Sequence, residues 1–385
     1  MAKKTNYEVN GYKYYKTTAT IGKKTDGTRI VKWFYGKSKK EAEDAKAKYL
    51  ANMSEQIDNK YKDIVFYDAF KDWLFNIKKA TVKASTFERY EGIYRNYIIN
   101  SSFARKTIEN ISSVDIQTYY NNLSKDGKTK SQISKLHKAI SPFFVYCYNN
   151  RYIKFNPCVN LIIPKDTLIN SKDNIDPFAD FEIDCIKNVC TGDTISNIFY
   201  ILLGTGLRIG ELLALTKGDI NFVKNEINVN KNIKKVKEFE NEDNYKYKTI
   251  LQPPKTDSST RKVPFPDNLS TILLKQLKNQ ELVYKNYGKE FNNSSLLLST
   301  KILTYYDDAN IRRAWQKLLE KANVRYRGIH SLRHTYATKL FQAGVPIKTV
   351  QVLLGHSDIR VTEGIYIHVM PSAKKNAVNS LNSLF

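Results

Sequence analysis

Between residues 165 and 179 the hydrophobic pattern of the chain stops. This stretch mixes Lys, Asp, Asn, Ser and Pro with no repeating apolar positions, which is typical of a linker. On both sides of it, apolar residues recur at helical spacing. A chain of 385 residues also exceeds what one compact core normally carries. The break therefore predicts separate domains at residues 61–164 and 180–385.

The stretch from residue 66 to residue 163 predicts four or five helices. Capping boxes are expected at Ser85–Glu88 and Ser112–Asp115, where a hydroxyl and an acidic side chain can satisfy the first backbone N–H groups. Pro142 either kinks a helix that starts at Ser131 or begins a new one. A core stripe is predicted at Phe70, Trp73, Leu74 and Ile77. These signals predict an all-α domain.

Upstream, residues 12–35 alternate aromatic or β-branched residues with polar ones, broken by a turn-like segment at 24–27. This predicts two or three strands, followed by a helix that a Ser38–Glu41 capping box opens and that runs to about Met53. The first 60 residues hold fourteen basic and seven acidic side chains. The sheet is either a solvated face or a reader of a DNA groove, because a β-ribbon fits the major groove.

The charge balance is strongly basic, with 62 Lys and Arg against 38 Asp and Glu, a net +24. Such a field attracts polyanions, so nucleic acid is the leading partner. The competing explanation is codon bias, because 49 of the basic residues are Lys and only 13 are Arg. No apolar run approaches the roughly 20 residues of a membrane span, and the basic N-terminus lacks the apolar core of a secretion signal. We expect a cytoplasmic protein with no membrane contact.

The four cysteines have no C-x-x-C spacing, so free buried thiols are expected in place of a zinc site or disulfides. They are Cys147, Cys158, Cys185 and Cys190. Residues 180–385 form the largest unit, which is predicted to be mainly helical with a strand-rich insert from Ile220 to Val263.

Four short motifs in this unit carry residues suited to chemistry. Arg208 follows a Gly-rich turn, His330 and Arg333 lie three residues apart, and His356 and Tyr366 come later. Each alone is compatible with a surface or structural role. However, four of the five histidines in the chain lie between residues 330 and 368. This clustering favours a site that needs imidazoles.

In the order Arg, His-x-x-Arg, Gly-His and Tyr, these motifs resemble the tyrosine recombinase family, which includes the integrases of phages and conjugative transposons. The resemblance implies a multidomain fold: a small N-terminal α+β arm-type DNA-binding module at 1–60, an all-α core-binding domain at 61–164, the linker at 165–179, and a mainly α catalytic domain at 180–385 with a small antiparallel β-sheet. Lys255 resembles the turn lysine of the family's β-hairpin, with Lys262 as the competing candidate. The segment 230–255 departs from the family pattern and suggests an extended β-insertion.

The predicted roles follow from what a phosphodiester requires. Attack on phosphorus builds negative charge on the non-bridging oxygens, which the guanidinium forks of Arg208 and Arg333 match. The phenol of Tyr366 would attack, and His330 would accept or orient its proton.

Three further side chains complete the predicted site. His356 would donate to a phosphate oxygen, and Lys255 would protonate the departing 5′ oxygen as a general acid. Glu211, one helical turn beyond Arg208, would orient that arginine. The product would be a 3′-phosphotyrosyl bond, which stores the phosphodiester energy, so no ATP, cofactor or metal is expected.

The resemblance thus implies a DNA integrase that integrates and excises a mobile element through a Holliday junction. Its partners would be double-stranded DNA at the element ends and target site, three further copies of itself in a homo-tetramer, and an excision factor. An apolar stripe at residues 378–385 would pack on its own domain or on a neighbouring subunit. The rival functions are a type IB topoisomerase and a non-catalytic DNA-binding regulator.

Overall fold

The computed structural model describes residues 6–9, 12–23, 29–55, 63–166, 176–253 and 259–369. The chain divides into two compact units, Met1–Asn170 with Phe239–Tyr245, and Ser171–Glu238 with Lys246–Phe385. This division is coarser than the domains predicted from the sequence, and it assigns part of the later chain to the first unit. Within the described ranges, no helix is long and apolar enough to cross a membrane.

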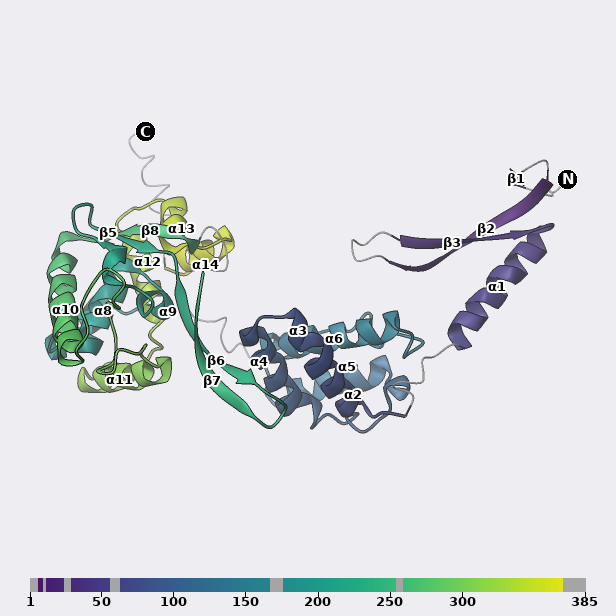
Figure 1. Ribbon diagram of the computed structural model, residues 1–385, viewed down its shortest axis with the longest axis horizontal. Helices are drawn as coiled ribbons and strands as arrows, with labels where there is room; N and C mark the ends of the chain where they lie inside the picture. The colour runs from purple at the N-terminus through teal and green to yellow at the C-terminus, as the bar shows by residue number, and fades with distance from the viewer. Residues whose placement is uncertain are drawn as a thin grey trace, which may run out of the picture. The chain divides into compact units, whose positions relative to one another are not determined.

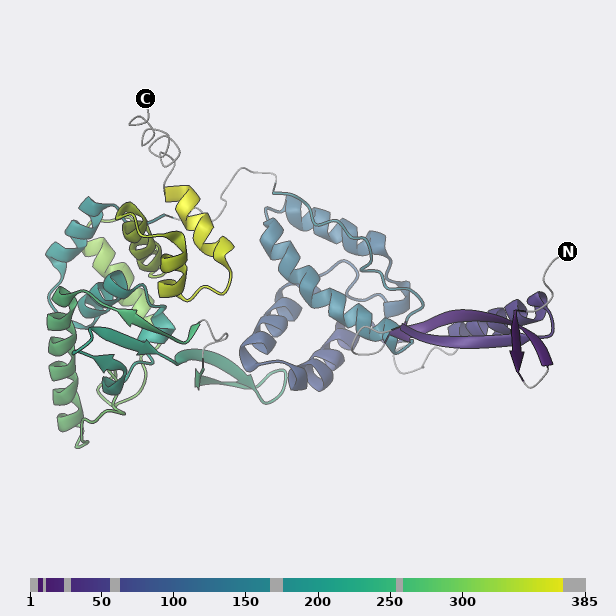
Figure 2. The same ribbon diagram turned by 90° about the horizontal axis from the view of Figure 1, so that it is seen from above.

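The N-terminal module is a three-stranded antiparallel sheet with one helix (Figure 1). Its strands are β1 (Tyr7–Val9), β2 (Tyr12–Lys23) and β3 (Arg29–Gly36), and its helix is α1 (Lys39–Glu55). Figure 2 shows the length and twist of the β2–β3 ribbon. On the face toward α1, the rings of Phe34 and Tyr49 lie 5.3 Å apart. The predicted strands and helix are confirmed, and the predicted turn at 24–27 lies outside the described residues.

The helical part of the first unit is confirmed as all-α. Its elements are α2 (Phe66–Asp72), η2 (Trp73–Lys78), α3 (Lys79–Thr81), α4 (Ala84–Ile93), η3 (Tyr94–Ile98), η4 (Ile108–Asn110), α5 (Ser113–Lys125) and α6 (Lys130–Asn149). Aromatic rings fill its core, as in the stacked pair Phe66 and Phe144 at 5.5 Å. Pro142 lies inside α6, which continues on both sides of it as one helix.

Two local predictions in this part were wrong. Ile77 is 36% exposed although Phe70, Trp73 and Leu74 are buried. The cause is that η2 is a π-helix with i→i+5 hydrogen bonds. The prediction assumed the spacing of an α-helix, so it placed Ile77 on the buried face when the wider π-helical turn directs it outward. The capping box expected at Ser85 is also absent, because α4 already begins at Ala84 and Lys83 caps it without a side-chain bond.

Other capping predictions held fully or in part. The capping box at Ser112 is confirmed. The Asp115 N–H donates to Ser112 Oγ at 3.2 Å, and the Ser112 N–H donates to Asp115 Oδ2 at 2.9 Å. At α1, the Glu41 N–H donates to Ser38 Oγ as predicted, at 3.2 Å. The Glu41 carboxylate, however, accepts from the N–H of Lys37 at 2.7 Å, one residue earlier than a capping box requires.

The second unit is mainly helical with small antiparallel sheets, as the resemblance implies. Its strands are β4 (Ile220–Asn221), β5 (Glu226–Val229) and β8 (Arg261–Pro264), in the order β4-β5-β8, and the pair β6 (Asn232–Phe239) and β7 (Tyr245–Gln252). Its helices are α7 (Asp180–Val189), α8 (Thr194–Thr205), α9 (Ile209–Leu212), η5 (Lys217–Asp219), α10 (Asp267–Asn286), α11 (Asp308–Lys321), α12 (Ser331–Gln342), α13 (Ile347–Leu354) and α14 (Ile359–Val369).

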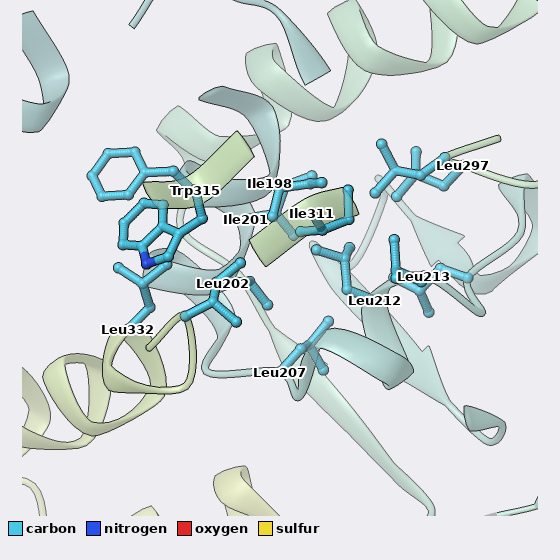
Figure 3. Close-up of a cluster of buried hydrophobic side chains, with 14 of the residues drawn as sticks. Ile198, Ile201, Leu202, Leu207, Leu212, Leu213, Leu297, Ile311, Trp315 and Leu332 are labelled. Atoms are coloured by element: carbon cyan, nitrogen blue, oxygen red, sulfur yellow. The ribbon is translucent and has the colours of Figure 1, made fainter. Parts of the chain in front are cut away.

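The core of this unit forms around α8 and α11. Trp315 is fully buried, and its ring stacks on Phe199 at 6.1 Å. In Figure 3, Leu202 and Leu332 lie beside this ring, so the core reaches the first turn of α12. A smaller apolar cluster joins α12, α13 and α14. These contacts set the positions of the segments that carry the predicted site.

The extended β-insertion predicted at 230–255 is the β6–β7 hairpin, and its tip belongs to the first unit. There the ring of Phe239 meets Phe87 edge-on at 5.5 Å. Lys79 Nζ donates to the Phe239 carbonyl at 2.7 Å. The tip is therefore held by the buried ring of Phe239 and by a hydrogen bond from the Lys79 side chain to a backbone carbonyl. All four cysteines are free, and Cys147 and Cys158 are buried.

Candidate active site

The turn between α8 and α9 positions Arg208. Gly206 ends α8 with φ +63°, a left-handed conformation that L side chains rarely adopt. A Cβ on Gly206 would also lie 2.3 Å from the ring of Tyr336. Tyr336 therefore packs on the turn, and Arg208 follows as the N-cap of α9.

Glu211 holds Arg208 by two bonds, which confirms their predicted pairing. Its Oε1 accepts from Arg208 Nη1 at 2.8 Å, and its Oε2 accepts from the Arg208 N–H at 2.9 Å. The carboxylate is buried, while Arg208 is about one-third exposed. Burial alone would raise the pKa of Glu211, but Arg261 and then Arg208 outweigh it, so the pKa is lowered and Glu211 is ionised.

Arg333 lies in the first turn of α12 and is 2% exposed. Its Nη1 donates to the Gly206 carbonyl at 2.7 Å, and its Nη2 donates to the carbonyl of Leu354. Arg333 thus joins the end of α8 to the end of α13. Burial and the neighbouring Arg208 lower the pKa of Arg333, although a guanidinium stays charged at neutral pH.

His330 is the N-cap of α12, and its carbonyl accepts from the N–H of Arg333 at 3.0 Å. His330 is exposed as a whole residue, but its imidazole is partly shielded from solvent and meets His334 edge-on at 5.0 Å. Desolvation, then the charges of His334, Arg333 and Arg208, lower the pKa of His330. Its imidazole is therefore neutral at pH 7 and able to accept a proton.

His356 follows the left-handed residue Gly355, φ +66°, at the end of α13. Its Nδ1 lies 2.9 Å from Oγ1 of the fully buried Thr362, and this contact orients the ring. Burial, then Arg333 and Arg208, lowers the pKa of His356 to about 3. The ring is neutral at physiological pH, with Nε2 available for a ligand.

A cavity of about 510 Å³ brings Arg208, His330 and His356 together. The other residues that line it are Glu211, Asn232, Gln252, Pro253, Ser259, Gly355, Ser357, Asp358 and Val361. Arg333 is buried and is not part of this lining. The guanidinium and imidazole groups around one buried carboxylate suit an anionic group such as a phosphate diester.

Besides Arg333, two other predicted site residues are not in this lining. Lys255 lies outside the described residues, so its placement stays a prediction. Tyr366, on α14, is half-buried and packs its ring edge-on against Phe341 at 5.2 Å. The structure therefore brings Arg208, His330 and His356 of the predicted set together at the cavity, and packs the tyrosine against the apolar cluster of α12–α14.

Sequence reasoning missed several residues. Asn232 and Gln252 line the cavity from the ends of the β6–β7 hairpin, and the buried Arg261 contacts Glu211. The scarcity of Arg in a Lys-rich chain was a signal for Arg261, but its partner lies fifty positions away. Within the described ranges, no group of three or more His, Cys, Asp and Glu side chains could hold a metal ion.

Comparisons with known proteins show which family the chain resembles. Residues 183–372 match the phage integrase family, and residues 65–124 match the phage integrase N-terminal SAM-like domain. A curated relative from Caldanaerobacter subterraneus subsp. tengcongensis, named tyrosine recombinase XerC-like, is 42% identical over the full length of both chains. The ICEBs1 integrase of Bacillus subtilis is 24% identical and covers 93% of this chain and 94% of its own.

Solved structures show the same fold. The Tn1549 transposon integrase in complex with a circular intermediate DNA superposes with a TM-score of 0.66 at 20% identity, covering 82% of this chain and 98% of that chain. A lambda integrase tetramer bound to a Holliday junction gives a TM-score of 0.54 at 14% identity, covering 93% of this chain and 96% of that chain.

Proposed function

The chain belongs to the phage integrase family of tyrosine recombinases, and on that premise we propose that it integrates and excises a mobile element by site-specific recombination of DNA. The observation that carries the proposal is the cavity that joins Arg208, His330 and His356, with Glu211 buried behind Arg208. The similarity to the ICEBs1 integrase and to the integrase of the Tn1549 transposon supports the choice of substrate.

In the proposed reaction, a DNA phosphate occupies this cavity. Arg208 and Nε2–H of His356 donate to its non-bridging oxygens, where negative charge grows during attack. The neutral His330 accepts the proton of the attacking phenol. The Tyr366 oxygen bonds to phosphorus, the 5′ oxygen leaves, and Lys255 donates a proton to it. The reaction needs no ATP, because the phosphotyrosyl bond conserves the energy of the broken bond. No metal is expected in this proposal, because the guanidinium and imidazole groups stabilise the charge on the phosphate.

Tyr366 must leave its packing against Phe341 to attack. Its ring lies in the apolar cluster and does not line the cavity. We therefore place a rearrangement of Tyr366 between DNA binding and the first cleavage. Four copies would then exchange strands through a Holliday junction on the element ends and the target, an arrangement similar to that of the lambda integrase tetramer.

The N-terminal sheet supplies a second DNA contact in this proposal. The face away from α1 carries Lys16, whose Nζ lies 3.7 Å from the ring centroid of Trp33 and 4.2 Å from that of Tyr7. Trp33 is 49% exposed. A basic, aromatic face on the long β2–β3 ribbon of the sheet suits the major groove, so this module would bind an arm site separate from the crossover site.

The decisive experiment captures the covalent intermediate on a nicked suicide substrate that contains an end of the element. The wild-type chain should form a 3′-phosphotyrosyl adduct, in EDTA as well as in Mg²⁺. Tyr366→Phe should abolish the adduct and keep binding close to wild type, because only the attacking oxygen is lost. An adduct that persists in Tyr366→Phe would refute the assignment. Relaxation of supercoiled plasmid without a matched site would indicate a topoisomerase.

A further inference from the structure

Arg261 is a buried cation that the proposed reaction does not use. It is the first residue of β8 and is 9% exposed. Its Nη2 donates to Glu211 Oε2 at 3.0 Å, and its Nη1 donates to Glu211 Oε1 at 3.3 Å and to the Ser259 carbonyl at 3.2 Å. Arg261 does not line the cavity itself. It contacts a residue that does.

The Glu211 carboxylate is shared by two guanidinium groups. Each of its oxygens accepts one bond from Arg208, through the side chain or the backbone N–H, and one from Arg261. Arg208 is partly exposed at the cavity, whereas Arg261 is enclosed. The buried side of the carboxylate is therefore neutralised by Arg261, and the side toward the cavity is left to hold Arg208.

Arg261 also reaches the segment that carries His356. Its Nε donates to the Leu353 carbonyl at 2.7 Å, and the next carbonyl, that of Leu354, accepts from Arg333. The last carbonyls of a helix have no partner within the helix. Two arginines fill that role at the end of α13, immediately before Gly355 and His356.

We propose that Arg261 is a positioning residue for strand cleavage, which sets Arg208 through the Glu211 carboxylate and sets His356 through the Leu353 carbonyl without touching DNA. This inference rests on the proposed function. A packing role alone would not require one side chain to contact both the partner of Arg208 and the end of α13.

The proposal predicts a change in pH dependence. Among the described residues, the charged or titratable groups that face Glu211 are Arg208 on α9, Arg261 on β8, and His330 and Arg333 at the start of α12. Burial raises the pKa of Glu211, and Arg261 is the largest opposing cause. Without Arg261 the carboxyl should therefore gain a proton at higher pH and release Arg208.

The test compares Arg261→Met, Arg261→Lys and the double variant Arg261→Met with Glu211→Gln. Arg312→Met is the matched control, because Arg312 is an exposed arginine on α11. Single-turnover cleavage of the suicide substrate is measured from pH 5.5 to 8.5, together with core-site binding and thermal unfolding.

Arg261→Met should cleave about ten- to a hundredfold more slowly at pH 7, as expected for a residue that orients a substrate-binding group, with binding nearly unchanged. Between pH 5.5 and 8.5 the cleavage rate of Arg261→Met should rise with pH, whereas the wild-type rate should stay constant. The double variant with Glu211→Gln should show no such rise, because it has no carboxyl group to titrate at this position. Arg261→Lys should recover part of the rate, because one ammonium can pair with Glu211 but cannot also reach Leu353 as the planar fork does.

A wild-type rate and a flat profile in Arg261→Met would overturn the proposal. So would losses of rate, binding and melting temperature in parallel, since they indicate a structural role. If Arg261→Met does not fold, a folded Arg261→Lys that binds and cleaves like the wild type would also overturn it. Failure of the wild type and Arg312→Met to form the adduct would instead count against the proposed function.

Discussion

Arg208 and Arg333 carry the same side chain in different surroundings. Arg208 faces the cavity and contacts only Glu211 through its side chain among the bonds described, whereas Arg333 is enclosed and bonded to two backbone carbonyls. The first is free to bind a phosphate. The second holds the ends of α8 and α13 as well, so its loss should affect folding in addition to chemistry.

We predict that Arg208→Lys slows single-turnover cleavage by about 10²- to 10³-fold and leaves the melting temperature within a degree or two of the wild type. A lysine keeps the charge but loses the bidentate fork. Arg333→Lys should slow cleavage and also lower the melting temperature, because one ammonium cannot replace both carbonyl bonds. Equal melting temperatures for the two variants would contradict this distinction.

His356 links the site to the pH dependence of folding. Its pKa is about 3 in the folded chain and near 6.5 when unfolded. Between these values only the unfolded chain binds a proton there, so this contribution to stability is present above pH 6.5 and is lost as the pH falls toward 3. The melting temperature should therefore fall between pH 7.5 and pH 5.

The variant His356→Gln should show a smaller fall in melting temperature over the same range, since Gln does not titrate and can still contact Thr362. Thermal unfolding in matched buffers measures the slope. His330 and His334, whose pKa values are also lowered, should retain part of the effect. An unchanged slope in His356→Gln would show that folding does not lower the pKa of His356.

The turn at the end of α8 is the element on which the site most depends. We predict that Gly206→Ala costs about 1–2 kcal/mol for the left-handed backbone, with an added cost because its Cβ would meet the Tyr336 ring at 2.3 Å. The displaced Gly206 carbonyl is a partner of Arg333, so cleavage should also slow.

Gly344→Ala is the matched control for this prediction. Gly344 has φ +79° but no atom within 4 Å of an added Cβ. It should therefore lose stability from backbone strain alone and cleave DNA nearly as fast as the wild type. Melting temperature and single-turnover rate are measured for both variants. The prediction fails if both glycine variants lose rate equally.

For the whole molecule, the main prediction is bivalent binding of DNA. Deleting residues 1–60 should preserve cleavage of an isolated core site but weaken assembly on full element ends, because linked modules raise each other's effective concentration. The truncated chain should also show a shallower dependence of affinity on salt, since the module contributes phosphate contacts. A footprint identical to that of the full chain would contradict the arm-binding role.

Much of the architecture follows from local pattern. Periodicity and turn signals predicted the N-terminal sheet and helix, the all-α region and the strand-rich insert, because these depend on neighbours a few residues apart. The predictions failed where a helix is not an ordinary α-helix or begins without a side-chain cap. The π-helix at Trp73–Lys78 turned Ile77 outward, and α4 began one residue before the expected Ser85 cap.

For the site, the sequence by itself determined the residue types and their order, from Arg208 to Tyr366. It also predicted the Arg208–Glu211 pair, because a helical turn joins residues three apart. Only the tertiary structure decided that Arg261 contacts Glu211 across fifty residues, and that Tyr366 packs on Phe341 away from the cavity. Such contacts depend on how β8, α9 and α14 pack together, and no local spacing in the chain encodes that packing.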